Sequence, residues 1–528
     1  MATRKKSSTV KPSGKKSVKK SEEKKTIETG LARAHEPGDL IDMHEAIELL
    51  KTTRPTFYRW LRSGKIKGMK VGRQWRFYRD DIDRFLKGEE PRIGLPADIT
   101  PLIKTLRSKI RKVTGKKLAV SDEPELVQAA DLIMSLGVMT NSSDIHIAPQ
   151  ITGHGREPET ILRLRIDGVL HRVTDMDSRL LPPLVEEFKR RMGCDTHMKE
   201  RPQDGRNLAK LPYVDKEKAD KAMDFRASFL PTGLGESVTL RILDSSAVSI
   251  GLDAIEFSDS DRDRLMQALG SPWGLIVISG PTGSGKTTTL YSCLNERTGE
   301  HVKTVSVEDP IEYYLPWVNQ VAVNPSAGVT FSSAVKAIFR TDPDIIAIGE
   351  IRDQETMMAA LQASLTGHLV MTQLHAPTTV KALGRMIDMG IDPFMVTEAT
   401  RLILAQRLVR KLCSECSEKY QPSTTELDRM ASMAREGGLN WHDLKKDFRK
   451  PVGCDACAKT GYKRRNVITE TLVMAPEIAR ALSTGSTHEE IEEIAIKQGM
   501  VTLAADGVRK AASGETSIDE VLRVLGLK

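Results

Sequence analysis

The sequence predicts an α/β protein with several separately packed parts. A chain of 528 residues with 39% apolar residues is long enough for about three or four domains. Three observations favour the α/β class: an apolar strand that runs through a glycine-rich loop into a helix, two further β-branched strands that end in acids, and alternating strands upstream. The longest apolar runs have strand length, well short of the roughly 18 residues that a membrane span needs.

The net charge of +8 is concentrated at the amino terminus. Residues 1–30 hold ten Lys or Arg and three Glu, with almost no large apolar side chains. Such a segment cannot offset its ordering entropy, so residues 1–36 are expected to form a disordered basic tail, either a solubilising tail or a tether to an anionic surface. No apolar stretch follows the lysines, which argues against a secretory signal and for a cytoplasmic location.

Residues 37–88 form a basic and aromatic module. From Lys51 to Arg79 the sequence has ten basic residues, no acidic residue and six aromatic rings. Its pattern predicts two helices, a two-stranded ribbon and a last helix that begins with acids. The expected bounds are 44–50, 54–64 with a closing Gly64, 65–79 with a turn at Gly72, and 80–86.

This order of elements resembles the small winged helix-turn-helix of excisionase and MerR-like proteins. The matching residues are Thr56, Tyr58, Arg59 and Arg62 on the recognition helix and Gly64, Val71, Gly72, Arg73, Trp75 and Arg76 on the wing. The resemblance implies DNA contact, mostly at phosphates, by Arg59, Arg62, Arg73 and Arg76. A winged helix reused for protein docking is the alternative. Residues 89–122 are expected to be a linker.

The stretch LIVISGPTGSGKTTTL, residues 275–290, is the strongest motif in the chain. Its glycines let backbone amides face phosphates, Lys286 neutralises the β and γ oxygens, and the Thr287 hydroxyl ligates Mg²⁺. The sequence therefore predicts ATP and Mg²⁺ as cofactors. The expected nucleotide-binding residues are Gly280, Pro281, Thr282, Gly283, Ser284, Gly285, Lys286, Thr287, Thr288 and His375.

Two further strand ends carry acids. KTVSVEDPIEY, residues 303–313, places Glu308 at the end of one strand, and DIIAIGEIRD, residues 344–353, places Gly349 and then Glu350 at the end of another. Phosphoryl transfer needs a positioned water and charge neutralisation in addition to the loop. We expect Glu350 to orient or deprotonate the attacking water and Glu308 to hold the metal's water shell or share that task. Solvated loop acids are the alternative.

His368 and His375 bracket a third strand in TGHLVMTQLHA, residues 366–376. Sensing of the γ-phosphate is a better expectation for a strand-end histidine here than general-base catalysis, and a structural hydrogen bond is the alternative for either residue.

These motifs, in this order, resemble the type II secretion and type IV pilus assembly ATPases, a family of hexameric motors with a RecA-like P-loop core. The similarity covers residues 123–528. It implies an arginine-bearing α+β domain at 123–244, the ATPase core at 245–411, a zinc-binding clip at 412–470 and a helical segment at 471–528. It also implies that Arg206 and Arg226, and by weaker matches Arg163, Arg165 and Arg241, reach the nucleotide phosphates and act in catalysis; surface ion pairs are the alternative for each.

Four of the six cysteines form two C-x-x-C pairs that are separated by 37 residues: Cys413 and Cys416, then Cys454 and Cys457. In a cytoplasmic chain this spacing indicates a metal and not disulfides. The pairs resemble the zinc clip of the assembly and secretion branch. That resemblance implies a closed tetrahedral thiolate site with a structural role.

Taken together, the resemblance implies a cytoplasmic, hexameric Mg-ATP-hydrolysing motor that assembles pilin-like filaments at the inner membrane through a platform protein. Two alternatives stay open. One is a DNA-binding ATPase that remodels DNA or a nucleoprotein complex through residues 37–88, which stand where family members carry their docking adaptor. The other is a regulator with a vestigial ATPase, against which the intact loop and Glu350 argue.

Overall fold

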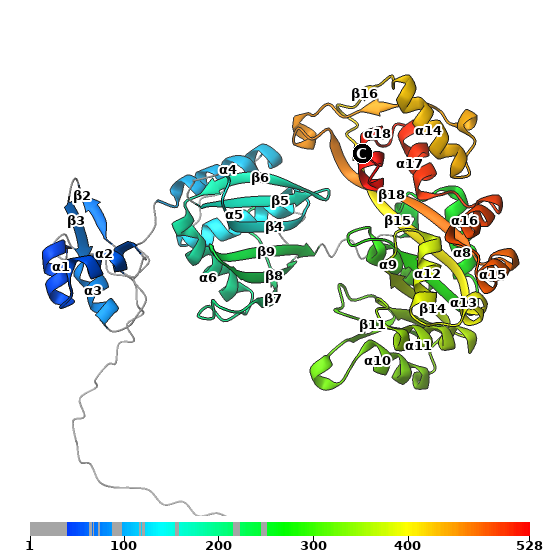
Figure 1. Cartoon of the computed structure of the whole chain (residues 1–528), viewed down its shortest axis with the longest axis horizontal. Coiled ribbons are helices and arrows are strands. Elements are labelled where there is room, and N and C mark those ends of the chain that lie inside the picture. Colours follow the sequence, from blue (N-terminus) through cyan, green and yellow to red (C-terminus); the bar gives the residue numbers. More distant parts are fainter. Residues whose placement is uncertain are drawn as a thin grey trace, which may run out of the picture. The chain divides into compact units, whose positions relative to one another are not determined.

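The computed structural model describes most of the chain in two compact units, Met1–Leu95 and Pro96–Lys528 (Figure 1). The described residues are 40–62, 66, 68–71, 74–86, 98–115, 118, 122–153, 158–214, 222–243 and 251–527. The predicted tail at 1–36 lies outside them, as do Gly64, Gly72 and Arg73 of the module and the Arg62 side chain.

The first unit is a small three-stranded antiparallel sheet, in the order β1-β3-β2, with three helices. Its elements are β1 Leu40–Asp42, α1 Met43–Leu49, α2 Arg54–Arg62, β2 Met69–Val71, β3 Gln74–Tyr78 and α3 Arg79–Leu86. Phe57 of α2 packs edge to face on Phe77 of β3 with ring centroids 5.1 Å apart, and both are buried. The expected ribbon gains a third strand, because β1 pairs along β3.

The second unit begins with a six-stranded antiparallel sheet of order β6-β5-β4-β9-β8-β7, which shares one apolar core with three helices. Its elements are α4 Thr100–Thr114, α5 Glu125–Met139, β4 Ser142–Gln150, β5 Glu159–Ile166, β6 Val169–Met176, η2 Ser178–Leu180, α6 Leu181–Arg191, β7 Gln203–Ala209, β8 Met223–Thr232 and β9 Gly235–Leu243. Residues 100–114, expected in the linker, instead form α4, since Leu102, Leu106 and Ile110 bury one face of that helix in this core.

A seven-stranded sheet follows, in the order β12-β11-β13-β14-β10-β15-β18. Neighbouring strands are parallel except β18, which runs antiparallel to β15. The strands are β10 Gly274–Ser279, β11 Thr304–Glu308, β12 Val318–Ala322, β13 Ile345–Ile348, β14 Leu369–Leu374, β15 Thr400–Leu412 and β18 Tyr462–Val473. The crossover order and the parallel pairing are those of a sheet with helices on both faces.

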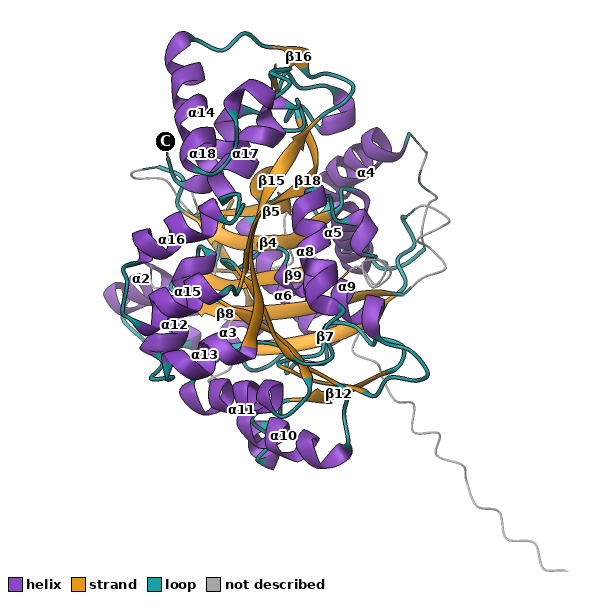
Figure 2. Cartoon of the chain, turned by 90° about the vertical axis from the view of Figure 1, so that its right-hand side faces the viewer, coloured by secondary structure: helices purple, strands orange, loops and turns teal. Residues whose placement is uncertain are grey.

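Helices cover both faces of this sheet (Figure 2). Leu275 and Val277 of β10 point into the core shared with α10–α13, α15 and α16, whereas Ile276 and Ile278 point into the core shared with α8 and α9. The helices are α8 Asp259–Leu269, α9 Lys286–Arg297, α10 Phe331–Ile338, α11 Gln354–Leu365, α12 Thr379–Asp388, α13 Pro393–Ala399, α15 Pro476–Ser483 and α16 His488–Lys497, with short η4 Leu252–Ala254, η5 Pro325–Ala327 and η6 Phe339–Thr341. An apolar core therefore lies on each face of the sheet, as the predicted α/β class requires.

β15 and β18 extend past the sheet as a long ribbon that carries the cysteines at its far end. Around that end lie β16 Glu418–Lys419, α14 Thr424–Glu436, η7 Trp441–Asp443, β17 Arg449–Lys450, η8 Asp455–Cys457, α17 Leu503–Ala512 and α18 Ile518–Leu525. α14 packs against α17 and α18, so the insertion and the C-terminal helices share one core. Residues 462–470, expected in the clip, pair with β15 as part of the main sheet.

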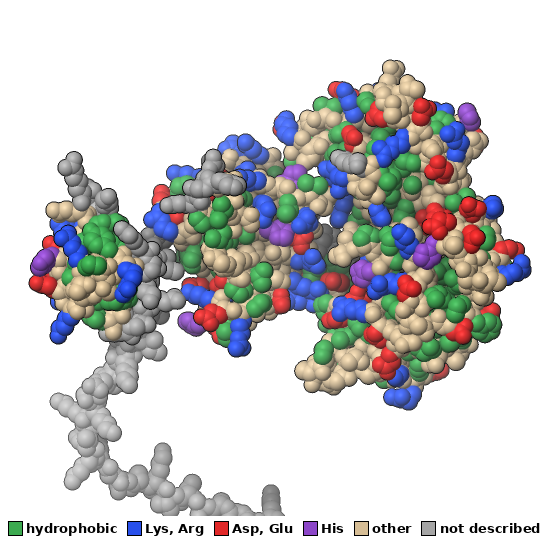
Figure 3. All heavy atoms as spheres, in the orientation of Figure 1, with side chains coloured by type: hydrophobic (Ala, Val, Ile, Leu, Met, Phe, Trp, Pro, Cys, Tyr) green, Lys and Arg blue, Asp and Glu red, His purple; other side chains and the backbone are tan. Residues whose placement is uncertain are grey.

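The outer face of the C-terminal segment is acidic where α16 lies (Figure 3). Glu489, Glu490, Glu492 and Glu493 follow one another there, while Ile491 and Ala495 are buried. Among the described residues, no helix combines the length and the apolar character that crossing a bilayer would require.

Candidate active site

The glycine-rich loop joins β10 to α9 in a conformation that only glycine adopts easily. Gly280, Gly283 and Gly285 have φ angles of 148°, 77° and 89°, in the region where a Cβ is strained. A Cβ on Gly280 would also lie 2.5 Å from the Gln406 carbonyl oxygen. These glycines therefore fix the loop, with its amides at the amino end of α9, as a phosphate-binding turn would require.

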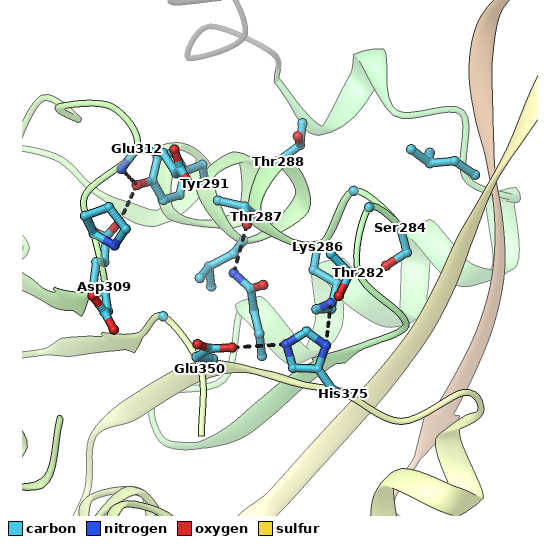
Figure 4. A pocket seen from close by; sticks show the side chains of 18 of the residues that line it. Thr282, Ser284, Lys286, Thr287, Thr288, Tyr291, Asp309, Glu312, Glu350 and His375 are labelled. Carbon is cyan, nitrogen blue, oxygen red and sulfur yellow. Dashed lines mark hydrogen bonds and ion pairs between the residues drawn. The ribbon is translucent and has the colours of Figure 1, made fainter. Parts of the chain in front are cut away.

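A pocket of ≈ 410 Å³ opens over this loop (Figure 4). It lies at the carboxyl ends of four parallel strands, β10, β11, β13 and β14, as expected for an α/β sheet. Its lining residues are Thr282 to Thr288, Leu290 and Tyr291 from the loop and α9, Glu308 at the end of β11 with Asp309, Pro310 and Glu312 after it, Gly349 and Glu350 after β13, Gln373 of β14 with His375 just after it, and Arg241, Leu408 and Arg465. Most of the residues expected to bind nucleotide thus meet in one place.

Lys286 is buried at the centre of the pocket. Its ammonium donates to the carbonyl oxygens of Gly280 at 2.9 Å and Pro281 at 3.1 Å, and lies 3.5 Å from Nδ1 of His375. Burial lowers the pKa of Lys286 to about 8, against the opposing charge of Glu350. The lysine is therefore held against the loop by the Gly280 and Pro281 carbonyl oxygens.

Glu350 faces Lys286 across His375. Nε2 of His375 lies 3.0 Å from Oε2 of Glu350, and Arg352 makes an ion pair with the same carboxylate. Figure 4 shows Lys286, His375 and Glu350 in one row. Gly349 makes room for this strand end, because a Cβ there would lie 3.2 Å from the Val307 carbonyl oxygen and 3.3 Å from Cα of Glu308.

Glu308 is buried and its two carboxylate oxygens are occupied by uncharged donors. The Tyr291 hydroxyl donates to Oε2, and Ser306 Oγ at 2.6 Å and Gln320 Nε2 at 3.0 Å donate to Oε1. Burial, and then the charge of Glu308, raise the pKa of Tyr291. Sequence reasoning missed these three partners, because Tyr291 and Gln320 come from α9 and β12 and only the strand order brings them to Glu308.

Two glutamines hold the loop and the expected magnesium ligand. Gln373 Nε2 lies 3.5 Å from Oγ1 of Thr287. On the other side, Gln406 of β15 accepts from Thr289 Oγ1 at 2.9 Å and donates to the Ser284 carbonyl at 2.8 Å. Neither glutamine was predicted, although Gln373 stands two residues before His375 on a strand whose end was expected at the site.

The two arginines expected to reach phosphates contact the segment that follows Glu308. Arg206 pairs with Asp224 at 2.6 Å and reaches the Ile311 carbonyl at 3.4 Å, while Arg226 lies 3.0 Å from the Glu312 carboxylate. Neither lines the pocket.

Three arginines were expected on weaker matches. Arg241 lines the pocket and pairs with Asp144 at 3.0 Å, Arg165 lies 3.5 Å from the same carboxylate, and Arg163 does not line the pocket. Arg465, which the sequence did not single out, lines the pocket from β18.

His368 lies at the opposite end of β14 from His375. Its Nδ1 is 3.0 Å from the Ala363 carbonyl oxygen, and its ring packs near Phe339 with centroids 6.2 Å apart. It does not line the pocket. Of the two histidines, only His375 is placed to contact a nucleotide there.

The four paired cysteines converge into one cluster. The Sγ distances are 3.9 Å for Cys413 and Cys454, 3.8 Å for Cys416 and Cys457, and 3.7 Å for Cys454 and Cys457. A tetrahedral Zn²⁺ with Zn–S bonds of about 2.3 Å keeps its sulfurs about 3.8 Å apart. Backbone amides of Gly453 and Gly461 donate to two of the sulfurs, which favours thiolates. The cluster can hold a metal ion, and its four sulfurs would fill a tetrahedral coordination sphere with no place for a further ligand.

The predicted DNA contacts of the first unit are only partly described. Arg59 is exposed on α2, while the Arg76 guanidinium lies 3.8 Å from Asp42 and donates to Gln74 Oε1 at 3.1 Å.

The chain matches two protein families. Residues 120–523 match the model of the type II/IV secretion system protein family, and residues 41–90 match a helix-turn-helix domain. The latter agrees with the predicted winged helix, and the comparisons give no support to DNA binding.

Curated relatives are similar over most of the chain. The type IV pilus assembly ATPase PilB of Thermus thermophilus is 36% identical over 446 residues, which are 82% of this chain and 48% of that protein. The type II secretion system protein E of Aeromonas hydrophila is 37% identical over 407 residues, 77% of each chain. The chain thus spans about half of the Thermus relative and most of the Aeromonas one.

Two solved structures share the fold. The ATPase DotB of Legionella pneumophila aligns with a TM-score of 0.53 at 18% identity, over 75% of this chain and 95% of that one. DotB of Yersinia pseudotuberculosis aligns with a TM-score of 0.55 at 17% identity, over 78% and 97%. This likeness concerns the fold alone and confirms the RecA-like core with a preceding α+β domain.

Proposed function

We propose, because the chain belongs to the type II/IV secretion system protein family, that it is a motor which hydrolyses Mg-ATP to drive assembly of pilin-like filaments. It acts at the cytoplasmic face of the inner membrane. The observation that carries the proposal is the row formed by Lys286, His375 and Glu350 over the phosphate loop.

The chemistry follows from that row. Glu350 orients the attacking water and takes its proton as the water oxygen bonds to the γ-phosphorus. The bond from that phosphorus to the bridging oxygen breaks, ADP leaves with this oxygen, and Lys286 neutralises charge on the phosphate oxygens. The spacing fits the His375 tautomer in which Nε2–H donates to Glu350 and Nδ1 accepts from Lys286. In that position His375 senses the terminal phosphate. The negative charge of a phosphate beside Lys286 changes the hydrogen bonds of His375 with Lys286 and with Glu350. Thr287 would hold Mg²⁺, which supplies charge neutralisation when bound.

Glu308, Arg206 and Arg226 act around this centre. Glu308 is fixed by its donors and would hold the water shell of a bound Mg²⁺. Arg206 and Arg226 touch Ile311 and Glu312, three and four residues beyond Glu308, and we propose that they exchange these contacts for phosphate oxygens when the arginine-bearing domain moves. In this way phosphate charge is converted into domain motion.

The working assembly is a homo-oligomer, a ring of six, that acts on a polytopic platform protein of the inner membrane. These proposals are supported by relatives that are named for type II secretion and type IV pilus assembly. Sizing of the full chain with and without nucleotide tests the ring, and co-purification with the platform protein tests the partner.

The four-cysteine cluster binds zinc as a structural clip. Elemental analysis should find about one zinc per chain, and Cys416→Ser should lose it together with stability of the insertion. Full thermal stability of a zinc-free protein would contradict this role.

The experiment that tests the motor is phosphate release by the purified full chain. We expect Mg²⁺-dependent ATP hydrolysis and its loss in Lys286→Ala, which should also lose ATP binding because the buried ammonium is removed. Hydrolysis that persists in Lys286→Ala would show that another site does the chemistry.

A further inference from the structure

We propose that Ser279 and Glu470 are positioning residues for His375: together they clamp the short loop after β14 and hold the imidazole between Lys286 and Glu350. The proposal rests on the role given above to His375. It concerns residues that do not line the pocket and that sequence patterns did not single out.

Ser279 clamps the loop on the side of the phosphate-binding turn. It is the last residue of β10, is fully buried and stands next to Gly280. Its hydroxyl accepts from the Ala376 amide at 3.2 Å and donates to the Ala376 carbonyl at 2.9 Å. Both backbone groups of the residue that follows His375 are thus tied to the strand that enters the loop.

Glu470 clamps the other side from β18. Its Oε1 accepts from the amide of Thr379 at 2.8 Å and from the Thr379 hydroxyl at 2.6 Å, and its Oε2 accepts from the Leu503 amide at 3.2 Å. Thr379 and Leu503 are the first residues of α12 and α17. A carboxylate at two helix amino ends satisfies otherwise orphaned amides and is favoured by both helix dipoles.

The burial of Glu470 indicates that this clamp is specific. Only 2% of the residue is exposed, and a buried carboxylate is costly unless its oxygens are hydrogen-bonded. The hydrogen bonds that offset this cost include those to Thr379, which ends the His375 loop. Ser279 anchors Ala376 and Glu470 anchors Thr379, and Pro377 and Thr378 lie between these two residues. Displacement of this four-residue loop would move His375 out of the row.

The alternative is that Glu470 only stabilises the fold. A double-mutant cycle separates the positioning role from a purely structural one. If Glu470 acts through His375, its substitution should lower kcat very little in a variant that already lacks His375. We would measure kcat and KM for Mg-ATP with the full chain for Glu470→Ala, His375→Ala and the double variant. The expectation is that Glu470→Ala lowers kcat about tenfold with KM within about twofold, and lowers it less than about twofold in the His375→Ala background.

Two further variants keep the test decisive. Ser279→Ala removes one hydroxyl and should lower kcat about threefold, again without effect in the His375→Ala background. Glu470→Gln keeps an oxygen for Thr379 and should recover most of the activity lost in Glu470→Ala.

A matched control is Asp506→Asn. Asp506 is a buried carboxylate on α17 that accepts from the amide of Thr469, the neighbour of Glu470, at 2.8 Å. Within the described chain, its side chain has no hydrogen bond or ion pair to the His375 loop, so the substitution should lower Tm and leave kcat within about twofold.

The outcomes are distinct. Equal losses from Glu470→Ala in both backgrounds, with the same for Ser279→Ala, would overturn the positioning role and leave the proposed ATPase intact. An unchanged kcat in His375→Ala alone would instead remove the proposed role of His375, and the clamp with it.

Discussion

Glu350 and Glu308 end neighbouring parallel strands and look alike in the sequence, yet the structure surrounds them differently. Glu308 is buried, and its oxygens accept from three uncharged groups fixed in the sheet and in α9. The Glu350 side chain is 19% exposed, and its partners Arg352 and His375 are 63% and 42% exposed. A carboxylate with immobile neutral donors is suited to hold a position, whereas one with exposed side chains as partners, an arginine and a histidine, can exchange them and take up a proton.

The largest expected effect is that of Glu350→Gln. The amide cannot accept the proton of the attacking water, so kcat should fall at least about 100-fold while ATP affinity stays within about threefold. Phosphate release and fluorescent-nucleotide titration measure the two quantities. Undiminished hydrolysis would reverse the assignment of the acid.

Glu308→Gln should have a smaller effect on activity and a larger one on stability. We expect kcat to fall about tenfold, and Tm to drop because the amide hydrogens would face the Tyr291, Ser306 or Gln320 donors, a cost of about 1–3 kcal/mol. Glu350→Gln should leave Tm nearly unchanged, since its partners are exposed. A greater loss of kcat in Glu308→Gln than in Glu350→Gln would break the comparison.

Tyr291→Phe tests the surroundings of Glu308 without changing its charge. Removal of one of three donors should lower kcat about threefold and stability by about 1 kcal/mol, as followed by kinetics and thermal unfolding. The control is Tyr314→Phe, whose residue is 80% exposed in the segment after β11 and should have no measurable effect. Equal effects of the two substitutions would mean that the hydrogen bond to Glu308 is unimportant.

The smallest expected effect is a shift in the pH dependence of ATP binding. Burial lowers the pKa of Lys286 to about 8, and the protonated form binds phosphate, so the affinity for ATP should be constant well below pH 8 and fall as pH rises through it. Because Glu350 raises that pKa, Glu350→Gln should move the midpoint to lower pH.

Glu308→Gln serves as the matched control for this titration and should leave the midpoint in place. Nucleotide titrations between pH 6.5 and 9.5 would measure both variants. An unmoved midpoint in Glu350→Gln would indicate that its carboxylate does not act on Lys286.

Short sequence motifs predicted those residues of the site that lie within one motif or at the end of one strand. The glycines of the loop, Lys286 and the two strand-end acids follow from strand, turn and helix signals, and the parallel sheet then brings the strand ends together. Tyr291, Gln320 and Gln406 could not be found in this way, because their roles depend on strand order and register between distant segments. Their partners are defined only by the folded sheet.

Two features of the structure that were not predicted are nevertheless indicated by the sequence. The spacing of Leu102, Leu106 and Ile110 is helical. This periodicity predicts a helix at residues 100–114, although the segment lies between two domains. The direction of β14 separates the histidines as well: a site at carboxyl strand ends selects His375 and excludes His368.

One continuous strand, β15, touches both the phosphate loop and the cysteine cluster, through Gln406 and, directly after its end, Cys413. These residues are seven apart, about 23 Å along an extended chain. The strand is thus held at both ends. If the cysteines hold a metal ion, its loss would free the outer end of the ribbon, and local unfolding would spread along the two strands to the loop over which the nucleotide is expected to bind.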